Sequence, residues 1–212
     1  MSILIDDEEK VSATQTVFNH GVDDYAQICG KETISNGGLG YGDTVYSGGK
    51  EFVYGVTSGA IISSGGSLFV SSGGTVSAST LRGGTLTVSS GGSVSGGLTI
   101  SSGTANISGT VATGQTITFA GSGGDLALYP GNLATFHATI GGFSTGDKFD
   151  LGGFAYSAGE TRSFAEYASH TSGLLTVTDG ADVAKLTLLG NNTSSDFALS
   201  NDAHGGTFVK FV

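Results

Sequence analysis

Aspartate residues in the C-terminal half of the chain carry the side chains best suited to bind a metal ion. Asp125 follows a run of glycine and serine, and Asp147 and Asp150 lie between Gly146 and Gly152. Carboxylate oxygens are the ligands that Ca²⁺ prefers, and Asp179 and Asp202 could join them if the fold gathered these residues. Aspartate beside glycine is also ordinary turn chemistry. The sequence therefore leaves two alternatives, a calcium site or a set of plain turns, and predicts no other cofactor.

The middle of the chain offers little to acid–base catalysis. Between Glu51 and Asp125 the only charged residue is Arg82, whereas general acid–base chemistry needs ionisable groups at the reacting centre. The histidines are scattered in no metal-ligand spacing, at His20, His137, His170 and His204. An enzyme acting on polysaccharides would need clustered carboxylates or a basic side chain in a groove. We therefore predict no catalytic residue and keep a polysaccharide-acting enzyme as an alternative.

Two copies of one pattern, residues 67–77 and 85–95, lie 18 residues apart, and eight of the eleven aligned pairs are identical. A fixed period of this length is typical of repeat proteins, in which each unit buries its apolar side against its neighbours. Within a unit, apolar Leu86 and Val88 alternate with polar side chains, which indicates a strand. Each strand then ends at Gly-Gly, where the chain can turn sharply.

Short strands and tight turns that recur about every 18 residues indicate the coils of a β-solenoid, stacked about 4.8 Å apart. Short and long spacings between the glycine turns alternate, which predicts two arms in each coil. An open solenoid end exposes unpaired backbone groups, so a cap is expected. We predict an all-β protein: an acidic leader over residues 1–13, a parallel β-solenoid (β-helix) over residues 14–120, and a β-rich C-terminal cap over residues 121–212.

Two local predictions concern the cap. Alternating segments on either side of Asp179-Gly180 predict a β-hairpin with its turn at this dipeptide. The segment 163–170 is the single candidate for a helix, and it is short.

Composition and charge narrow the class of protein. The 212 residues include 38 glycines and one cysteine, and the formal net charge is −10. Nucleic acid is not an expected partner, because phosphate contacts need clustered lysine and arginine. No apolar run is long enough to predict a transmembrane segment, and the acidic N-terminus does not have the pattern of a secretory signal. Cys29 has no partner for an internal disulfide, and we expect it to be a small buried side chain.

The repeats Ser-Ser-Gly-Gly-Thr-Val at 71–76 and Thr-Leu-Thr-Val-Ser-Ser-Gly-Gly at 85–92 resemble the strand-loop-strand repeats of AIDA-type autotransporter passenger adhesins, over roughly residues 14–120. Residues 140–151 and 196–207 are similar to the tail of many bacterial proteins that carry such repeats. The C-terminal region also resembles that of type I secreted proteins, whose uncleaved export signal ends in apolar residues. Residues 121–128 resemble one calcium-binding RTX nonapeptide.

The resemblance implies a secreted or bacterial cell-surface protein that acts without catalysis, in adhesion, self-association or the building of an extracellular matrix such as that of a biofilm. Its implied partners are a second copy of itself in a homo-oligomer, glycans, or a host or matrix surface. Serine and threonine of such repeats can carry O-linked heptose in that family. By this analogy, the candidates for O-glycosylation are Ser71, Ser72, Ser89 and Ser90.

Exposed aromatic and threonine side chains could form a binding face. Aromatic rings stack on sugars or on a partner protein, although Phe69 could equally cover a neighbouring coil. An ice-binding solenoid is a further alternative, but its threonine ranks would be regular, and here they mix with serine, phenylalanine and glycine. The predicted ligand or self-association face consists of Tyr46, Tyr54, Phe69, Thr75, Thr85 and Thr87.

Overall fold

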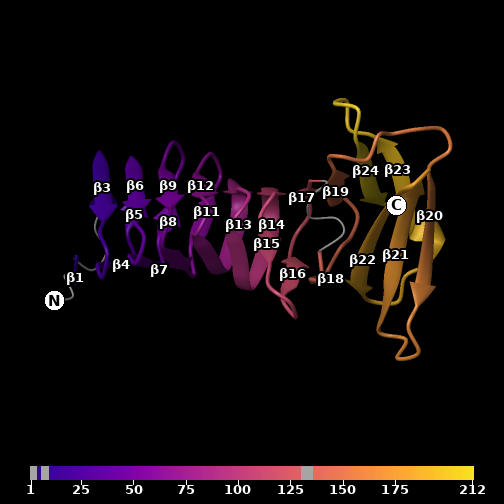
Figure 1. The fold of residues 1–212 in the computed structure, drawn as a ribbon, viewed down its shortest axis with the longest axis horizontal. Helices are drawn as coiled ribbons and strands as arrows, with labels where there is room; N and C mark the ends of the chain where they lie inside the picture. Colours follow the sequence, from indigo (N-terminus) through magenta and orange to yellow (C-terminus); the bar gives the residue numbers. More distant parts are fainter. Residues whose placement is uncertain (1–3, 6–9, 130–135) are drawn as a thin grey trace.

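The computed structural model describes residues 4–5, 10–129 and 136–212. Short strands wind into an elongated solenoid, and longer antiparallel strands cover its C-terminal end (Figure 1). The strands of successive coils pair in parallel, which confirms the predicted parallel β-solenoid.

Each complete coil contains three strands. Strands β7 (Leu39–Tyr41), β8 (Thr44–Val45) and β9 (Lys50–Val53) form one coil, and β10 (Val56–Ser58), β11 (Ile61–Ser63) and β12 (Ser67–Val70) of the next coil pair with them in the same order. The prediction of two arms is therefore wrong.

The prediction of two arms failed because of the corner between the first and second strands. That corner turns on a single residue with positive φ, such as Gly42 or Gly59, or on Tyr25 or Ala78. Among the described coils, only that of β14 has a Gly-Gly pair there, at Gly96-Gly97, so counting glycine pairs misses this corner in the other coils.

The outer sides of the three strands define three faces, which we call the first-strand, second-strand and third-strand faces. Strands β13 and β14 are continuous and contribute to all three. The remaining solenoid strands are β1 (Leu4–Ile5), β2 (Lys10–Val11), β3 (Thr14–Val17), β4 (Val22–Asp24), β5 (Gln27–Ile28), β6 (Lys31–Ile34), β13 (Thr75–Val88), β14 (Ser93–Ile107), β15 (Thr110–Val111), β16 (Thr116–Phe119), β17 (Gly124–Leu128), β18 (Thr139–Gly141) and β19 (Lys148–Leu151).

The core is a column of stacked side chains. Alternation along each strand sends every second residue inward, and parallel register places equivalent residues of successive coils directly above one another. The inner ladder of the third strands contains Leu68, Leu86, Ala105, Leu126 and Phe149, all with 0% exposure. Burying an aliphatic or aromatic side chain of this size contributes about 1.5–3 kcal/mol relative to leaving it exposed.

The Gly-Gly corners are required by close approach of the backbone. At the corner after β12, Gly73 has φ +84°, and a Cβ on Gly74 would collide with the carbonyl oxygen of Val53 in the preceding coil. Any larger residue at position 74 would push the coils apart.

The C-terminal cap is antiparallel. A meander of β20 (Thr161–Glu166), β21 (Ser172–Asp179) and β22 (Asp182–Leu189) is followed by the 3-10 turn η1 (Ser194–Asp196) and a hairpin of β23 (Phe197–Asn201) and β24 (Thr207–Phe211). Strand β24 pairs antiparallel with β19, and β22 pairs in parallel with β18. The cap therefore closes the solenoid edge through the same backbone ladders.

The predicted hairpin is confirmed, because β21 and β22 pair antiparallel. Its turn is Gly180-Ala181, one residue later than the predicted Asp179-Gly180, since Asp179 still pairs with Asp182. The helix prediction for 163–170 is wrong. Phe164 instead pairs with Leu175 in the sheet, and its ring lies 5.8 Å from that of Phe197, so tertiary packing overrides a weak local preference. The division of the chain at residues 13 and 120 stays a prediction; parallel pairing continues to β19.

Two further observations bear on the sequence analysis. Cys29 is exposed, so the expectation of a buried thiol is wrong; it follows the inward-facing Ile28 and therefore points outward at a corner. Among the described residues, no helix has the length and apolar character needed to cross a membrane.

Candidate functional site

The third-strand face carries an aromatic pair. Phe52 on β9 and Phe69 on β12 are in register, and their rings stack with centroids 5.0 Å apart and planes 16° apart. The ammonium group of Lys31 lies 5.0 Å from the centroid of the Phe52 ring, a cation–π distance. Thr33 precedes this pair on the same outward ladder and Thr87 follows it. An apolar strip with one cation is thus bordered by hydroxyl groups.

The structure brings together only part of the predicted binding face. Phe69, Thr85 and Thr87 lie on the third-strand face. Thr75 instead lies on the first-strand face, where its hydroxyl is 2.9 Å from that of Ser93. Tyr46 and Tyr54 are exposed at the corners after β8 and β9.

Phe52 was missed by the sequence analysis. The 17-residue offset from Phe52 to Phe69 is the signal that could have found it, since this offset is one coil. Phe69 covers the preceding coil through Phe52 and is half-buried; its role in binding a sugar or a partner stays a prediction.

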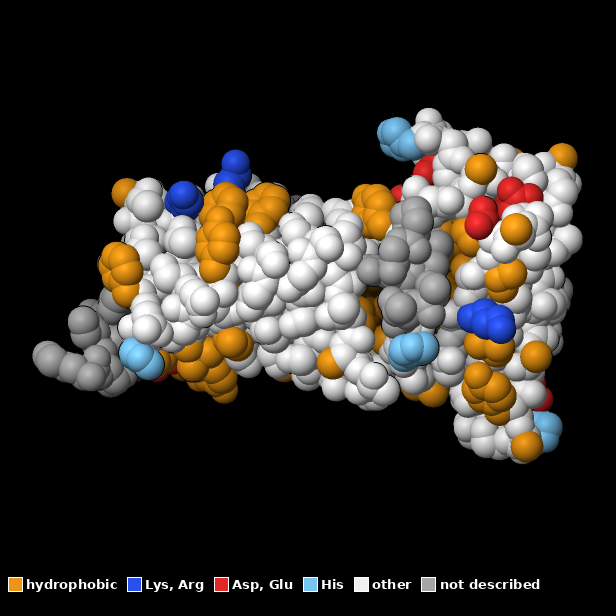
Figure 2. Space-filling view, in the orientation of Figure 1, with side chains coloured by type: hydrophobic (Ala, Val, Ile, Leu, Met, Phe, Trp, Pro, Cys, Tyr) orange, Lys and Arg blue, Asp and Glu red, His pale blue; other side chains and the backbone are white. Residues whose placement is uncertain are grey.

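The coils that follow this pair have a neutral surface. Figure 2 shows hydrophobic and basic side chains gathered over the N-terminal coils on this face of the molecule, whereas the middle coils show mainly backbone atoms and side chains that are neither hydrophobic nor charged. Arg82 is exposed, and it is the only charged residue between Glu51 and Asp125. This surface can donate and accept hydrogen bonds but cannot supply an acid or a base.

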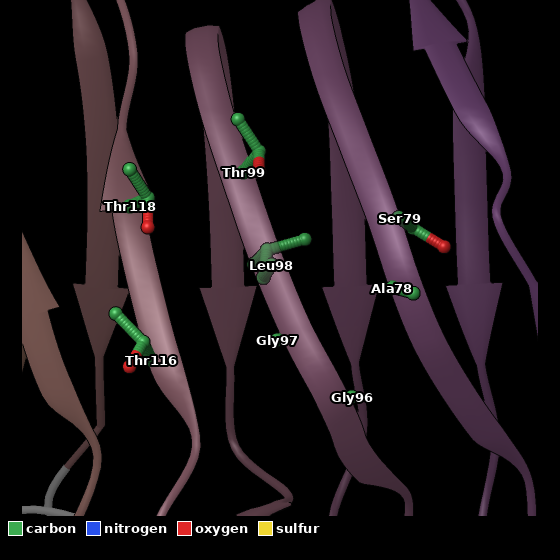
Figure 3. Close-up of a pocket in the computed structure, with 8 residues that line it drawn as sticks. All are labelled: Ala78, Ser79, Gly96, Gly97, Leu98, Thr99, Thr116 and Thr118. Atoms are coloured by element: carbon green, nitrogen blue, oxygen red, sulfur yellow. The ribbon is translucent and has the colours of Figure 1, made fainter.

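A shallow groove of about 350 Å³ crosses the middle coils (Figure 3). It opens where Gly96 and Gly97 lack side chains, and the hydroxyls of Thr99, Thr116 and Thr118 border it. The remaining lining residues are Ala78, Ser79 and Leu98. None of these residues is ionisable, so the groove fits a neutral polar ligand and has no group for proton transfer.

The candidate glycosylation serines lie at equivalent corners of adjacent coils. Ser72, Ser89 and Ser90 are exposed, and Ser71 is half-buried. All four follow a third strand, so sugars on them would project from the same edge of the solenoid. Glycosylation stays a prediction.

The predicted metal-binding aspartates have other partners. Asp147 is buried, and it accepts hydrogen bonds from the N–H of Gly124 (3.0 Å) and from the N–H (3.1 Å) and hydroxyl (3.2 Å) of Ser144. Asp125 pairs with Lys148 at 3.2 Å. Asp150 borders a cavity of about 340 Å³. Among the described residues these carboxylates do not converge on one point, and calcium binding by them stays a prediction.

The largest cluster of acidic groups lies where the sequence analysis did not place one, inside the N-terminal coils. Asp23, Glu32, Asp43 and Glu51 all have 0% exposure. The repeat register contained the signal for Glu51: its segment Glu-Phe-Val aligns with Leu68-Phe69-Val70, which places Glu51 at an inward position. The sequence analysis did not use this alignment of coils and therefore missed the cluster.

Comparison with solved structures finds a likeness to the TibC-catalyzed hyper-glycosylated TibA55-350 fragment, at 25% sequence identity and a TM-score of 0.41. The match covers 69% of this chain and 64% of that chain, so the chain spans less than two thirds of the length of the fragment. No protein-family model matches the sequence. No curated protein matches it either.

Proposed function

We propose that the protein is a non-enzymatic adhesive repeat protein, secreted or displayed on a bacterial cell surface, that binds neutral glycans through its third-strand face. The stacked pair of Phe52 and Phe69 is the observation that carries this proposal. Aromatic rings offer a flat apolar surface to the C–H face of a sugar, and adjacent hydroxyls can bond its hydroxyl groups. Thr85 and Thr87 extend the third-strand face, and Lys31 adds one positive charge beside the ring of Phe52.

The lack of charge on the middle coils also supports adhesion. A neutral surface approaches a neutral polysaccharide or matrix without the repulsion that like charges produce. The acidic residues of the rest of the chain give it the net charge of −10 that favours solubility. The resemblance of the repeats to autotransporter passenger adhesins agrees with this function.

The test is binding of the purified chain to immobilised neutral polysaccharides. Replacing both Phe52 and Phe69 by alanine should weaken binding by about tenfold or more, because aromatic anchors carry much of an interface's binding energy. Both rings are half-buried, so a Phe69→Leu variant, which keeps apolar packing but removes the ring, separates binding from folding. Tyr167→Ala, at an exposed aromatic of the cap, is the matched control. Binding that survives in all variants would contradict the proposal.

Self-association is a second candidate function, favoured by the same nearly uncharged surface of the middle coils. Two copies could align these surfaces without charge repulsion. Light scattering across a concentration series would show a mass that rises above 21.1 kDa if copies associate. A constant monomer mass at all concentrations would exclude this second function.

A further inference from the structure

The interior of the N-terminal coils holds acidic side chains from two successive coils, β4–β6 and β7–β9. Glu32 on β6 and Glu51 on β9 are register partners on the inner ladder of the third strands. Asp23 lies on β4, and Asp43 lies at the corner between β7 and β8. One ligand oxygen from each of Glu32, Asp43 and Glu51 lies within 4.8 Å of the other two.

These carboxyl groups have no cation to balance them. Among the described residues, no lysine or arginine forms an ion pair with any of the four. Burial raises the pKa of Glu32 to about 11, of Glu51 to about 8 and of Asp43 to about 7, and neighbouring carboxylates add to each rise. Burying charged groups without partners is costly, so a cluster of this kind is expected to hold protons or a cation.

Most oxygen atoms of the clustered side chains have no hydrogen-bond partner. The N–H of Ala26 donates to Oδ1 of Asp43 at 3.0 Å, and Nε2 of Gln15 donates to Oδ2 of Asp23 at 2.7 Å. These bonds orient two of the carboxylates but leave most oxygens free. The buried oxygens without a hydrogen-bond partner are one of Asp23, both of Glu32, one of Asp43, both of Glu51 and the hydroxyl of Thr57.

Thr57 points to a ligand independently of the carboxyl groups, because its hydroxyl is neutral and cannot be satisfied by taking up a proton. It has 0% exposure and no hydrogen bond of good geometry, although its hydroxyl is within reach of Glu51 and, as a hydrogen-bond donor, opposes the rise in the pKa of that group. A Cβ atom on Gly40 would collide with Oδ2 of Asp43 and lie 3.4 Å from the hydroxyl oxygen of Thr57. Both oxygens therefore face the small space that Gly40 leaves open.

From this geometry we propose that the N-terminal coils bind one Ca²⁺ ion inside the solenoid, held by Glu32, Asp43 and Glu51 and completed by Asp23 and Thr57. Calcium–oxygen distances are about 2.3–2.6 Å, so ligand oxygens that lie within 4.8 Å of one another can all touch one ion. Three carboxyl groups place an oxygen in this range, and Asp23 and Thr57 hold further oxygens without a hydrogen-bond partner. Ca²⁺ takes 6–8 oxygen ligands in flexible geometry, whereas Mg²⁺ demands six at shorter distance and keeps several waters. A buried cluster of protein oxygens therefore favours Ca²⁺.

The ion would fasten together the coils that contain β4 to β10, since its ligands come from successive coils. Because these side chains are fully buried, the ion enters when the N-terminal coils open or as they fold. This site is distinct from the aspartates of the C-terminal half and does not rest on the proposed adhesive function.

The test uses the full chain, unfolded in denaturant with a chelator and then refolded with or without CaCl₂. Isothermal titration and mass spectrometry under native conditions should give one bound Ca²⁺ per chain. Hydrogen exchange should slow by about 100-fold in residues 22–58 when free Ca²⁺ is 100 times Kd, because the ion binds only the closed coils. Exchange in the C-terminal cap should not change. MgCl₂ at the same concentration should have a much smaller effect.

Two variants of Glu51 keep the proposal open to refutation. Glu51→Leu introduces the residue found at the same ladder position in the following coils, and Glu51→Gln keeps the shape of the side chain. Both should lose the bound ion and the slowed exchange, while Asp125→Asn in the C-terminal half should keep them. Failure of the refolded chain to bind Ca²⁺, or binding that is unchanged in folded Glu51→Leu, would overturn the proposal.

Discussion

The same inner ladder of the solenoid contains glutamate in its first coils and aliphatic residues in the later ones. Glu32 and Glu51 occupy positions that Leu68 and Leu86 fill one and two coils further on. Backbone register is unbroken between them, so the parallel ladders tolerate either kind of side chain. The coil geometry is therefore set by strand pairing and glycine corners, whereas the inner ladder decides what each part of the column can bind.

Energetically, the two regions differ in what they need. The coils around Leu86 bury apolar groups and are stable without a ligand. The coils around Glu51 bury carboxyl groups, and they need protons or a cation to offset the cost of removing charge from water. We therefore expect the stability of the acidic coils, and not that of the apolar coils, to depend on pH and on bound cations.

Moving a glutamate into the apolar region should produce the largest effect. Leu86→Glu would place a carboxyl group among Leu68, Leu81 and other buried residues with no polar partner. We expect a loss of about 3 kcal/mol or more in the free energy of unfolding, as for other uncompensated buried charges. Urea unfolding would measure it.

Thr87→Glu is the matched control, because the adjacent position faces outward. A surface substitution of this kind should change stability by less than about 0.5 kcal/mol. Equal stability of the two variants would mean that the inner ladder does not distinguish the regions as we describe.

Raising the pH should weaken the acidic coils when no divalent cation is present. Burial raises the pKa of Asp43 to about 7 and of Glu51 to about 8 in the folded chain, while unfolding returns both to ordinary values near 4. The folded state therefore retains protons that the unfolded state releases. This contribution is complete below about pH 4 and is lost as the pH rises through 7 and 8.

Hydrogen exchange of residues 22–58 between pH 5 and 9 in a chelator, corrected for the intrinsic rate, would follow this loss. Glu51→Leu should flatten the profile, since it removes one of the titrating groups. An unchanged profile in that variant would show that these carboxyl groups do not control the stability of the N-terminal coils.

The contrast also explains what the sequence could predict. The solenoid follows from an 18-residue period and Gly-Gly corners, because both are local signals that repeat. The presence of three strands in each coil was not predicted, because the corner between the first and second strands turns on single residues such as Gly59. The helix predicted at 163–170 is wrong because Phe164 packs against the distant Phe197. Such contacts depend on residues far apart in the chain, which a local pattern does not contain.

The binding residues were predictable to different degrees. Phe69 was identified because it is aromatic within a polar repeat, but its partner Phe52 lies in a degenerate repeat and needed the register. The acidic cluster was hidden for a different reason. Glutamate is rarely buried, so its residue type gives no local sign of an inward position, and only the alignment of coils places Glu32 and Glu51 inside.

The smallest effect is expected where a carboxylate of the solenoid has a cation beside it. Asp125 lies at an outward position and pairs with Lys148 at 3.2 Å, with side-chain exposures of 15% and 35%. Burial raises the pKa of Asp125, and the charge of Lys148 opposes this rise. A pair of this kind contributes about 0.2–1 kcal/mol, so a double-mutant cycle of Asp125→Asn and Lys148→Met should give a coupling energy in this range that decreases at high salt.

Lys148→Met alone should cost more than Asp125→Asn alone, because the ammonium group also lies 4.1 Å from the centroid of the Phe208 ring. The cycle cancels this second contact and isolates the ion pair. A coupling energy of several kcal/mol would mean that the pair is as sensitive as the buried cluster. The difference between paired outward and unpaired inward carboxylates would then not account for the different responses to ions that we predict for the two ends of the solenoid.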